Sequence, residues 1–419
     1  MRKSCKIQFY PTSSQLLLMQ NIFNACRRVK NLYIEYNERT HEEGGKFISG
    51  YDFSKAFNKL KKRSEKYNWI RRGTSHAIKD AIMIEERAYK SFFKKNNGHP
   101  HFHSKKRTTK ESYFFIKEGI SFDYDSRIIK IPILGKVRVT EKDYLPDIST
   151  ITSGRVVREY DKYYLVFLYT TEKEPIETND LSIGIDVGVK NYASIAYSDG
   201  GKPVTIKHFK DKEEYKSLES KKVRLQQIIS RKVEINYGRK LNEYLDKNHG
   251  EEPNQAEKNK MKGESYNTSQ IHKLKKRIRS YTKRMNSIRR NYILQLVNYI
   301  TARTKPSVIT VEDLAISEMI KHDGTEDSAL HKYIAESGFY FFKTHLTSKC
   351  EYYGIKLRTA DKYFASSKTC CCCGKKKEHL TLSDRVFKCD YCPNEMDRDL
   401  NAAYNLLDLK DKKCNIITA

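Results

Sequence analysis

The stretch "LSIGIDVGVKNYASIAYSDGGKPVTIKHFK", residues 181–210, decides the fold of the second half of the chain. It predicts three strands of an antiparallel meander, because runs rich in β-branched residues are separated by turns at 189–191 and 199–201. Asp186 lies inside the first strand, where its neighbours are apolar or glycine. A carboxylate in such a place is costly unless it is paired or binds a cation.

Two more acids stand at similar places. Glu312 ends the apolar strand of "PSVITVEDLAI", residues 306–316, which follows a long helical crossover and is therefore expected to lie parallel to the first strand. Asp399 lies in "MDRDLNAAYNLL", residues 396–407, at the predicted start of the last helix, where an acid suits the positive helix end. Each acid alone also fits a cap or a strand-end charge. Together they match a ribonuclease H-like sheet that gathers acids around two Mg²⁺ ions, which predicts hydrolysis of a DNA or RNA backbone.

A cysteine pattern precedes the third acid. "FASSKTCCCCGKKK" and "FKCDYCPNEMD" contain Cys370, Cys373, Cys389 and Cys392 in the spacing C-x2-C-x15-C-x2-C. Two such knuckles can complete a tetrahedral zinc shell of four thiolates, which leaves no open position for chemistry. A register in which Cys372 replaces Cys373 also fits. Disulfides are disfavoured because the start of the chain shows no signal peptide and an intracellular chain is expected.

The charge balance favours a polyanionic partner. Lys plus Arg number 80 against 52 acids, a net charge of +28, and the 29 tyrosines offer faces on which bases can stack. Low-GC genomes also encode basic, tyrosine-rich chains, so composition alone is moderate support. A membrane is disfavoured, because no apolar stretch reaches the roughly 20 residues needed to span a bilayer.

Residues 211–303 are predicted to be mostly helical, with a polar and mobile interruption at 248–265. The last of these helices has an apolar stripe with spacings of three and four, which predicts a packing seam: Ile271, Leu274, Ile278, Tyr281, Met285, Ile288 and Tyr292. No acid occurs between Ser265 and Val311, so we expect the basic face of this helix to lie along phosphates. Its candidate contacts are Lys275, Arg277, Arg279, Lys283 and Arg284.

The first half predicts a β domain with a helical insertion. A short strand at 6–9 ends before Pro11, and Thr12 or Ser13 is a good helix N-cap. Helices are predicted near 13–43, 51–66 and 74–96, and a period-two pattern runs from about 113 to 171. The alternating histidines of "GHPHFHSKK", residues 98–106, favour a phosphate-contacting loop over a metal site, since no cysteine or paired carboxylate completes one.

These motifs resemble the TnpB family, the transposon-encoded RNA-guided nucleases related to type V CRISPR effectors. The resemblance rests on "GIDVGVKNYA", "VEDL" and "SSKTC…CG…CDYC…DRDLNAAYN" in that order, and on "YPTSSQ" followed by "RRVKN" near the start. It covers nearly the whole chain, and the combined C-terminal motif is its most specific part.

The resemblance implies a multidomain α+β fold. Its parts are a wedge β-barrel (1–10 and 111–175), a helical recognition insertion (11–110), a RuvC-like, ribonuclease H-like α/β nuclease domain (181–362 and 395–419) and an inserted zinc ribbon (363–394). The implied catalytic acids, which also hold two Mg²⁺ or Mn²⁺ ions, are Asp186, Glu312 and Asp399, the last preferred to Asp397 because x-Asn-Ala-Ala follows it. Arg398 is a candidate phosphate contact.

The resemblance also implies partners and a place of action. These are a guide RNA from the transposon end, a target DNA with a short adjacent motif, one chain per guide RNA, and the cytoplasm of a prokaryote, at the nucleoid. Cys371 and Cys372 fill a gap where the family usually has a serine and a variable residue, and Pro393 replaces an expected glycine. A guided DNA-binding repressor without cleavage and an unguided structure-selective nuclease are the alternatives.

Overall fold

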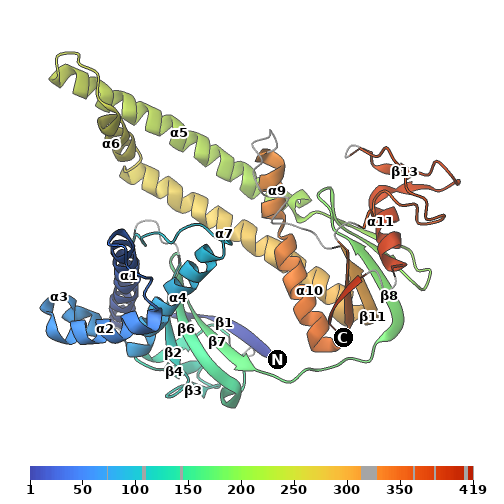
Figure 1. The fold of residues 1–419 in the computed structure, drawn as a ribbon, viewed down its shortest axis with the longest axis horizontal. Coiled ribbons are helices and arrows are strands. Elements are labelled where there is room, and N and C mark those ends of the chain that lie inside the picture. The colour runs from blue at the N-terminus through green and yellow to red at the C-terminus, as the bar shows by residue number, and fades with distance from the viewer. Residues whose placement is uncertain are drawn as a thin grey trace. The chain divides into compact units, whose positions relative to one another are not determined.

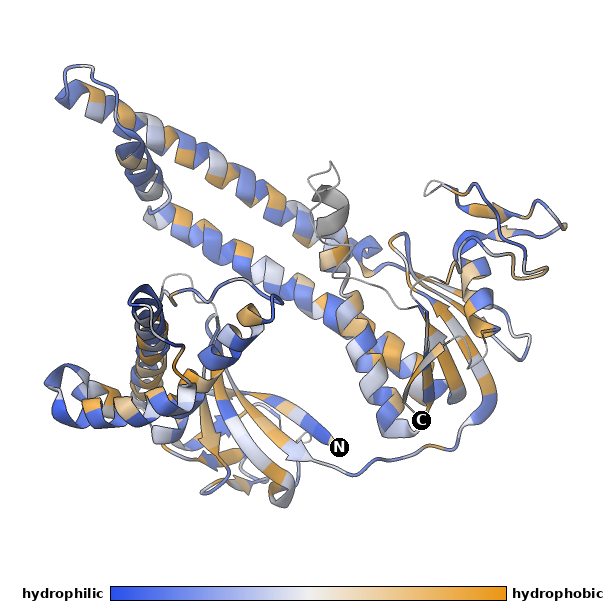
Figure 2. Cartoon of the chain, in the orientation of Figure 1, coloured by the Kyte–Doolittle hydropathy of each residue, from blue (hydrophilic) through white to orange (hydrophobic). Residues whose placement is uncertain are grey.

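The computed structural model describes residues 1–72, 74–105, 110–141, 145–312, 328–361, 364–381, 384–409 and 414–418. They form two compact units, Met1–Glu172 and Lys173–Ala419 (Figure 1). In both units the strands are rich in hydrophobic residues (Figure 2). No helix among the described residues is long and apolar enough to cross a membrane.

The first unit is built on one antiparallel sheet of seven strands in the order β2-β6-β7-β1-β5-β4-β3. The strands are β1 (Arg2–Tyr10), β2 (Lys110–Ile116), β3 (Ser121–Asp123), β4 (Ile128–Ile131), β5 (Gly135–Val139), β6 (Ile151–Glu159) and β7 (Lys162–Thr170), with a 3₁₀ turn, η2 (Ile148–Thr150), before β6.

This sheet curls strongly. Phe122 on the edge strand β3 lies with its ring centroid 5.5 Å from that of Phe167 on β7, although three strands separate them in the sheet. Phe115 on the other edge strand, β2, contacts the same ring at 6.2 Å. In a flat sheet, neighbouring strands lie roughly 4.8 Å apart, so β3 and β7 would be far beyond ring contact. The sheet therefore bends toward a barrel, while no ladder of described residues joins β2 to β3.

Four helices and a 3₁₀ turn are inserted between β1 and β2. They are α1 (Ser13–Glu42), α2 (Gly50–Arg63), α3 (Glu65–Asn68), η1 (Trp69–Arg72) and α4 (Ser75–Phe93). The predicted helices and the strand pattern of this half are confirmed. Thr12 is the N-cap of α1, in a capping box with Gln15 that satisfies two backbone N–H groups.

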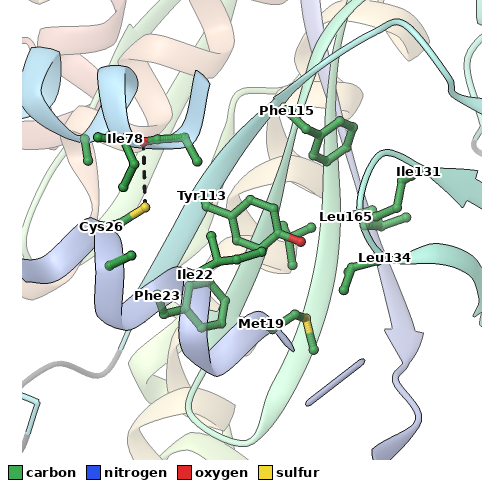
Figure 3. Packing of buried hydrophobic residues seen from close by; sticks show 14 of the residues in the cluster. Met19, Ile22, Phe23, Cys26, Ile78, Tyr113, Phe115, Ile131, Leu134 and Leu165 are labelled. Carbon is green, nitrogen blue, oxygen red and sulfur yellow. Dashed lines mark hydrogen bonds between the residues drawn. The ribbon is translucent and has the colours of Figure 1, made fainter. Parts of the chain in front are cut away.

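The core of the first unit lies between α1 and the sheet (Figure 3). Met19, Ile22 and Phe23 of α1 belong to one buried cluster with Tyr113 of β2 and Leu165 of β7, all at most 2 % exposed. These positions on α1 are three and four residues apart, so they share one helix face. This packing holds the helical insertion on the sheet.

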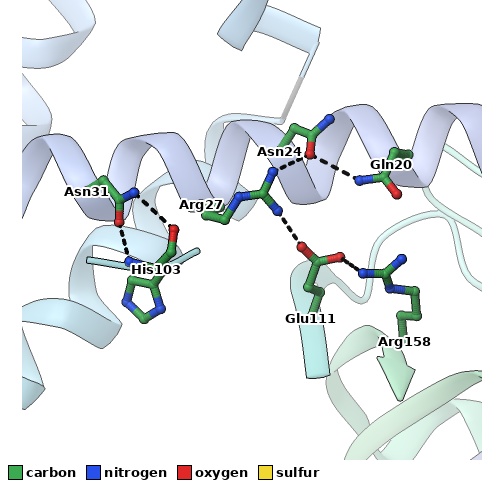
Figure 4. Close-up of polar contacts among 7 residues, drawn as sticks. All are labelled: Gln20, Asn24, Arg27, Asn31, His103, Glu111 and Arg158. Atoms are coloured by element: carbon green, nitrogen blue, oxygen red, sulfur yellow. Dashed lines mark hydrogen bonds and ion pairs between the residues drawn. The ribbon is translucent and has the colours of Figure 1, made fainter. Parts of the chain in front are cut away.

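A buried ion network also joins the insertion to the sheet (Figure 4). The Glu111 carboxylate accepts a hydrogen bond of 2.5 Å from Arg27 of α1 and forms an ion pair of 2.5 Å with Arg158 of β6. Asn31 of α1 holds the backbone of His103 with two hydrogen bonds of 2.8 and 3.1 Å. The "RRVKN" segment therefore acts here through structural contacts, and the His103 ring lies 2.9 Å from Glu85.

The second unit contains a mixed sheet in the order β10-β9-β8-β11-β12-β15. Its strands are β8 (Asn179–Asp186), β9 (Asn191–Tyr197), β10 (Val204–Lys207), β11 (Pro306–Val311), β12 (Lys356–Ala360) and β15 (Cys414–Thr418). β8, β9 and β10 form the predicted antiparallel meander. β11 pairs in parallel with β8, as predicted from the long crossover, and β12 pairs in parallel with β11.

The other elements of the second unit are mostly helices. They are η3 (Phe209–Asp211), α5 (Glu213–Lys247), α6 (Gln255–Ser265), α7 (Ser269–Asn298) with a π-helical turn η4 (Tyr299–Arg303), α9 (Ser328–Ser337), α10 (Phe339–Tyr353) and α11 (Arg398–Leu407), together with a small hairpin of β13 (Val386–Lys388) and β14 (Glu395–Asp397).

Helices α5 and α7 lie side by side (Figure 1). Their seam contains Ile229 and Val233 of α5 against Ile271, Leu274 and Ile278 of α7, the first three residues of the predicted stripe. The other four residues of the stripe pack against the core of the mixed sheet: Tyr281, Met285, Ile288 and Tyr292. The polar stretch 248–265 contains helix α6, which sequence analysis had treated as an interruption. Asn254 and Glu257 form a capping box at its start, and such caps can begin a helix that lacks an apolar face.

Different helices pack on the two faces of the mixed sheet. Ile183 and Ile185 of β8 point into a core with residues of α7 and α10. Side chains alternate along a strand, so Gly184 and Asp186 point to the opposite face. There Gly184 lies directly against the backbone of α11, close to Ala403 and Leu407.

Candidate functional site

Three elements of the second unit bring the predicted acids together. Asp186 is the last residue of β8, Glu312 directly follows the parallel neighbour β11, and Asp399 lies in the first turn of α11. The carboxyl ends of parallel neighbours meet at one sheet edge, and α11 packs on the face to which Asp186 points.

The electrostatics of Asp186 show how close these acids are. Burial raises the pKa of the Asp186 carboxyl well above its usual value, and the negative charges of Glu312 and Asp399 raise it further. Asp186 is 8 % exposed. A buried carboxylate beside two more is unfavourable unless a cation offsets the repulsion, so this donor set of carboxylate oxygens fits hard divalent ions such as Mg²⁺ or Mn²⁺.

The two aspartates of "DRD" have different contacts. Asp397 is the N-cap of α11, and its Oδ1 accepts from the backbone N–H of Asp399 at 2.9 Å and of Leu400 at 3.2 Å. Asp399 is turned toward the sheet, where Asn191 donates to its Oδ2 at 3.4 Å. Asp399 therefore points toward the sheet, and its choice over Asp397 as the catalytic aspartate stays a prediction.

Four cysteines form a second candidate metal site. The sulfurs of Cys370, Cys373, Cys389 and Cys392 lie within 4.8 Å of one another. The Cys370–Cys392 and Cys373–Cys389 sulfur distances are both 3.6 Å, close to the ~3.8 Å edge of a zinc tetrahedron with Zn–S bonds of ~2.3 Å. This grouping includes Cys373 and leaves out Cys372, which settles the register that the sequence left open.

The surroundings of the sulfurs also fit a bound metal ion. Asn394 donates to the Cys370 sulfur at 3.3 Å, and the backbone N–H of Tyr391 donates to the Cys389 sulfur at 3.4 Å. Such N–H donors stabilise thiolates, the form that binds zinc. The four sulfurs can therefore hold one zinc ion in a closed shell.

The basic residues predicted to contact nucleic acid differ in their exposure and in the contacts they make within the chain. Arg277 and Arg279 are exposed on α7. Arg284 forms an ion pair of 2.6 Å with Glu214 of α5, and the Lys275 ammonium lies 5.0 Å from the centre of the Tyr266 ring. Lys283 is half-buried.

Arg398 lies beside Asp399 and also contacts the segment between the two cysteine pairs. Its side chain is 14 % exposed, its Nη1 donates to the carbonyl of Thr381 at 3.0 Å, and its Nε lies 3.8 Å from Asp399 Oδ1. The guanidinium is therefore held by both the Asp399 carboxylate and the Thr381 carbonyl.

Sequence reasoning missed two residues of α11 beside this site. Asn401 and Asn405 are buried and hydrogen-bond the segment that carries the first cysteines. They stand inside the quoted motif "DRDLNAAYN", four residues apart. That spacing was the available signal, because it places two amides on one face of the helix.

Two family models match parts of the chain. One, described as "Cas12f1-like, TNB domain", matches residues 339–406, from the start of α10 to near the end of α11. The other, a "Helix-turn-helix domain" of the IS605 OrfB type, matches residues 1–46, which in this structure hold β1 and the single helix α1.

Curated relatives match over nearly the full chain. InsQ of Escherichia coli K12, whose name proposes an RNA-guided DNA endonuclease, is 24% identical over 413 residues, covering 96% of this chain and 90% of its own. A Streptomyces pristinaespiralis protein with the same kind of name is 22% identical, covering 97% and 89%. The TnpB-like protein L770 of Acanthamoeba polyphaga mimivirus is 26% identical, covering 96% and 72%.

Solved structures give a more distant likeness. The "mini-RNA-guided endonuclease CRISPR-Cas_phi3" is 11% identical with a TM-score of 0.48, covering 97% of this chain and 92% of its own. A Cas12f1 chain from a complex with sgRNA and target DNA is 15% identical with a TM-score of 0.34, covering 97% and 99%.

Proposed function

This chain belongs to the TnpB family, and we propose that it is an RNA-guided DNA endonuclease that cuts DNA beside a short target-adjacent motif. One observation carries the proposal: β8, the end of β11 and the start of α11 bring Asp186, Glu312 and Asp399 into electrostatic contact. A fold that only bound DNA would have no need of three adjacent carboxylates, one of them buried.

In this proposal the three acids are the catalytic residues and hold two divalent cations. Such a pair supplies stabilisation of both the attacking and the leaving oxygen of a phosphodiester, so no protein nucleophile is needed. Asp397 orients the first turn of α11, and Asn191 holds one oxygen of Asp399. Arg398, beside Asp399, would contact the phosphate being cut, in exchange for part of its contact with Thr381.

The cysteine site has a structural role in this proposal. Four thiolates close the coordination shell, so a zinc ion there does no chemistry. The second unit would then combine a RuvC-like nuclease domain (181–362 and 395–419) with a zinc ribbon (363–394). Its meander followed by parallel strands supports this division.

The first unit would supply two further domains. Its curled sheet would be the wedge barrel (1–10 and 111–175), and its inserted helices would be the recognition domain (11–110). Base pairing of the guide RNA would supply sequence specificity, while basic side chains such as Arg277 and Arg279 hold phosphates. We place the protein at the nucleoid, with one chain per guide RNA.

Co-expression with the flanking DNA tests the proposal. The protein is purified at high salt, the bound RNA is sequenced, and that RNA is used to direct cleavage of a plasmid library with randomised bases beside the target. We expect one dominant RNA with a constant part and a variable end, and cuts that need both the matching target and one adjacent motif.

The variant Asp186→Ala separates the alternatives. We expect it to retain RNA and target binding and to lose cleavage. Target binding without cleavage by the unaltered protein, with any divalent ion, would indicate a guided repressor. Cleavage that needs no guide would indicate a structure-selective nuclease, and cleavage that persists in Asp186→Ala would refute the assigned site.

A further inference from the structure

Two buried asparagines of α11 bind the cysteine-rich segment. Asn401 and Asn405 are 0 % and 7 % exposed and lie one turn apart, on the same helix face. Asn401 Nδ2 donates to the carbonyl of Thr369 at 2.7 Å, and its Oδ1 accepts from the backbone N–H of Cys371 at 3.0 Å. Asn405 Nδ2 donates to the carbonyls of Ser366 and Thr369 at 2.8 and 2.6 Å. We call these four bonds the asparagine latch.

The latched segment carries the first zinc-site thiolate. Cys370 lies between Thr369 and Cys371, the two residues that Asn401 holds. The Cys370 sulfur lies 3.6 Å from that of Cys392 and accepts from Asn394. A metal ion that fixes this sulfur therefore also fixes the backbone groups to which the latch binds.

The opposite side of α11 is set against the sheet. A Cβ on Gly184 of β8 would lie 2.5 Å from Leu407 N and 2.9 Å from its Cα, so β8 and the helix backbone are in direct contact. Asp399 lies two residues before Asn401 in this same short helix. A helix of ten residues moves as one body, so a shift at its latched face would also move Asp399.

We infer that Asn401 and Asn405 are positioning residues that couple metal binding at the four cysteines to divalent-cation binding at the acid site. The inference rests on the proposed function, because it requires that Asp186, Glu312 and Asp399 bind cations. Loading the cysteines orders residues 366–371, the latch transmits that order to α11, and Asp399 is held in the place where it binds a cation beside Asp186.

Coupling of this kind is reciprocal. If zinc at the cysteines strengthens Mn²⁺ binding at the acids by some factor, Mn²⁺ strengthens zinc binding by the same factor. Couplings between sites are typically about 5- to 150-fold, and we expect roughly tenfold here. A merely structural role would lower stability and leave this factor unchanged.

The experiment measures Mn²⁺ affinity in zinc-loaded and zinc-stripped protein by the electron paramagnetic resonance signal of free Mn²⁺. Mn²⁺ prefers oxygen ligands, so it reports on the acids and leaves the thiolates empty. The variants are Asn401→Ala, Asn405→Ala and the milder Asn401→Asp, which keeps the acceptor for the Cys371 N–H. Leu346→Ala, in the core formed with α10 on the other sheet face, is the stability control.

Co²⁺ substitution supplies an independent readout. The thiolate-to-cobalt absorption band shows that the cysteine site is still loaded in each variant, so a change in Mn²⁺ affinity is not a loss of zinc. Asp186→Ala identifies the measured Mn²⁺ site, because it is expected to abolish binding there in loaded and stripped protein alike.

We expect zinc removal to weaken Mn²⁺ binding roughly tenfold in the unaltered protein and in Leu346→Ala, about threefold in Asn401→Asp, and less than twofold in the two alanine variants. Equal zinc dependence in all of these proteins would overturn the latch, as would loss of coupling in Leu346→Ala. If no Mn²⁺ binds to the unaltered protein, the proposed acid site fails first, and the latch fails with it.

Discussion

The close approach of β8 to α11 gives a prediction that can be worked from distances. In Gly184→Ala, the new Cβ would lie 2.5 Å from Leu407 N and nearer still to the carbonyl of Ala403. An ordinary contact is roughly 3.5 Å, so α11 must move outward by about 1 Å. Both clashing groups are helix backbone, which cannot turn aside as a flexible side chain can. Overpacking of this kind costs about 1–3 kcal/mol of folding free energy.

The shift matters because Asp399 moves with α11 while Asp186 stays on β8. A displacement of about 1 Å of a group that positions the reaction lowers its rate by roughly 100-fold. We expect Gly184→Ala to lower the midpoint of thermal unfolding of the second unit by a few degrees for each kcal/mol, and to reduce guided DNA cleavage by about two orders of magnitude. Differential scanning calorimetry and single-turnover cleavage are the assays.

Two glycine variants serve as controls. Gly238→Ala lies on α5, where a Cβ would have no atom within 4 Å, and we expect normal cleavage and unchanged or higher stability. Gly154→Ala would press against the Phe115 ring in the first unit, so it destabilises that unit without moving α11. If Gly184→Ala cleaves DNA at the normal rate, or no worse than Gly154→Ala, then the position of α11 does not set the site and the reasoning is wrong.

Three further predictions concern buried charge. Burial, and then the charge of Lys210, lowers the pKa of His208 to about 4. The stabilising contribution of neutral His208 is therefore complete above about pH 6.5, and it falls by at most about 3 kcal/mol as the pH drops to 4. The variant His208→Asn can still accept from the Lys210 N–H, so we expect it to flatten that pH dependence in urea titrations, and an unchanged slope would contradict the prediction. Glu111→Ala leaves the Arg27 and Arg158 guanidiniums without their carboxylate, so we expect the free energy of unfolding of the first unit, measured in urea, to fall by about 3–5 kcal/mol. A loss below about 1 kcal/mol would show that water replaces the Glu111 carboxylate as the partner of the two guanidiniums. Asp186→Asn removes one of three mutually repelling acids, so the metal-free protein should melt at a higher temperature while cleavage is lost, and a lower melting temperature would mean that the acids do not repel.

The sequence predicted those parts of the fold that depend on local pattern or on general chain-connection rules. The Thr12 cap, the meander and the parallel placement of β11 are examples, because caps, turns and crossovers have residue signatures. Helix α6 was missed because its capping box, rather than an apolar face, marks its start. The C-x2-C spacing favoured Cys370 and Cys373 within the run of four cysteines, but it also allowed Cys372, since the choice depends on where the chain folds back.

Asp186 and Glu312 could be singled out because a charge inside or at the end of an apolar strand is anomalous, whereas Asp399, at the start of a helix, was singled out by its motif. The spacing of Asn401 and Asn405 places their amides on one helix face, but the sequence could not show their partners, because any residue can supply the backbone groups that they bind. Likewise, the only sign in the sequence of the contact at Gly184 is one glycine within a strand, and such a glycine has several possible explanations.

The strand order of the first unit has a consequence for synthesis on the ribosome. β1 emerges before the other strands of its sheet, yet it lies between β5 and β7, and its main partner β7 begins at Lys162. At about 5–20 residues per second, this partner appears roughly 8–30 s later. During that interval the helices α1 to α4 can form from local contacts. Ile7 and Phe9 of β1, which are buried in the folded unit, then still lack the neighbouring strands that cover them. The nascent chain thus carries an unpaired strand, with its apolar residues exposed, through most of the translation of this unit, and this is the stage at which a chaperone would have the most to protect.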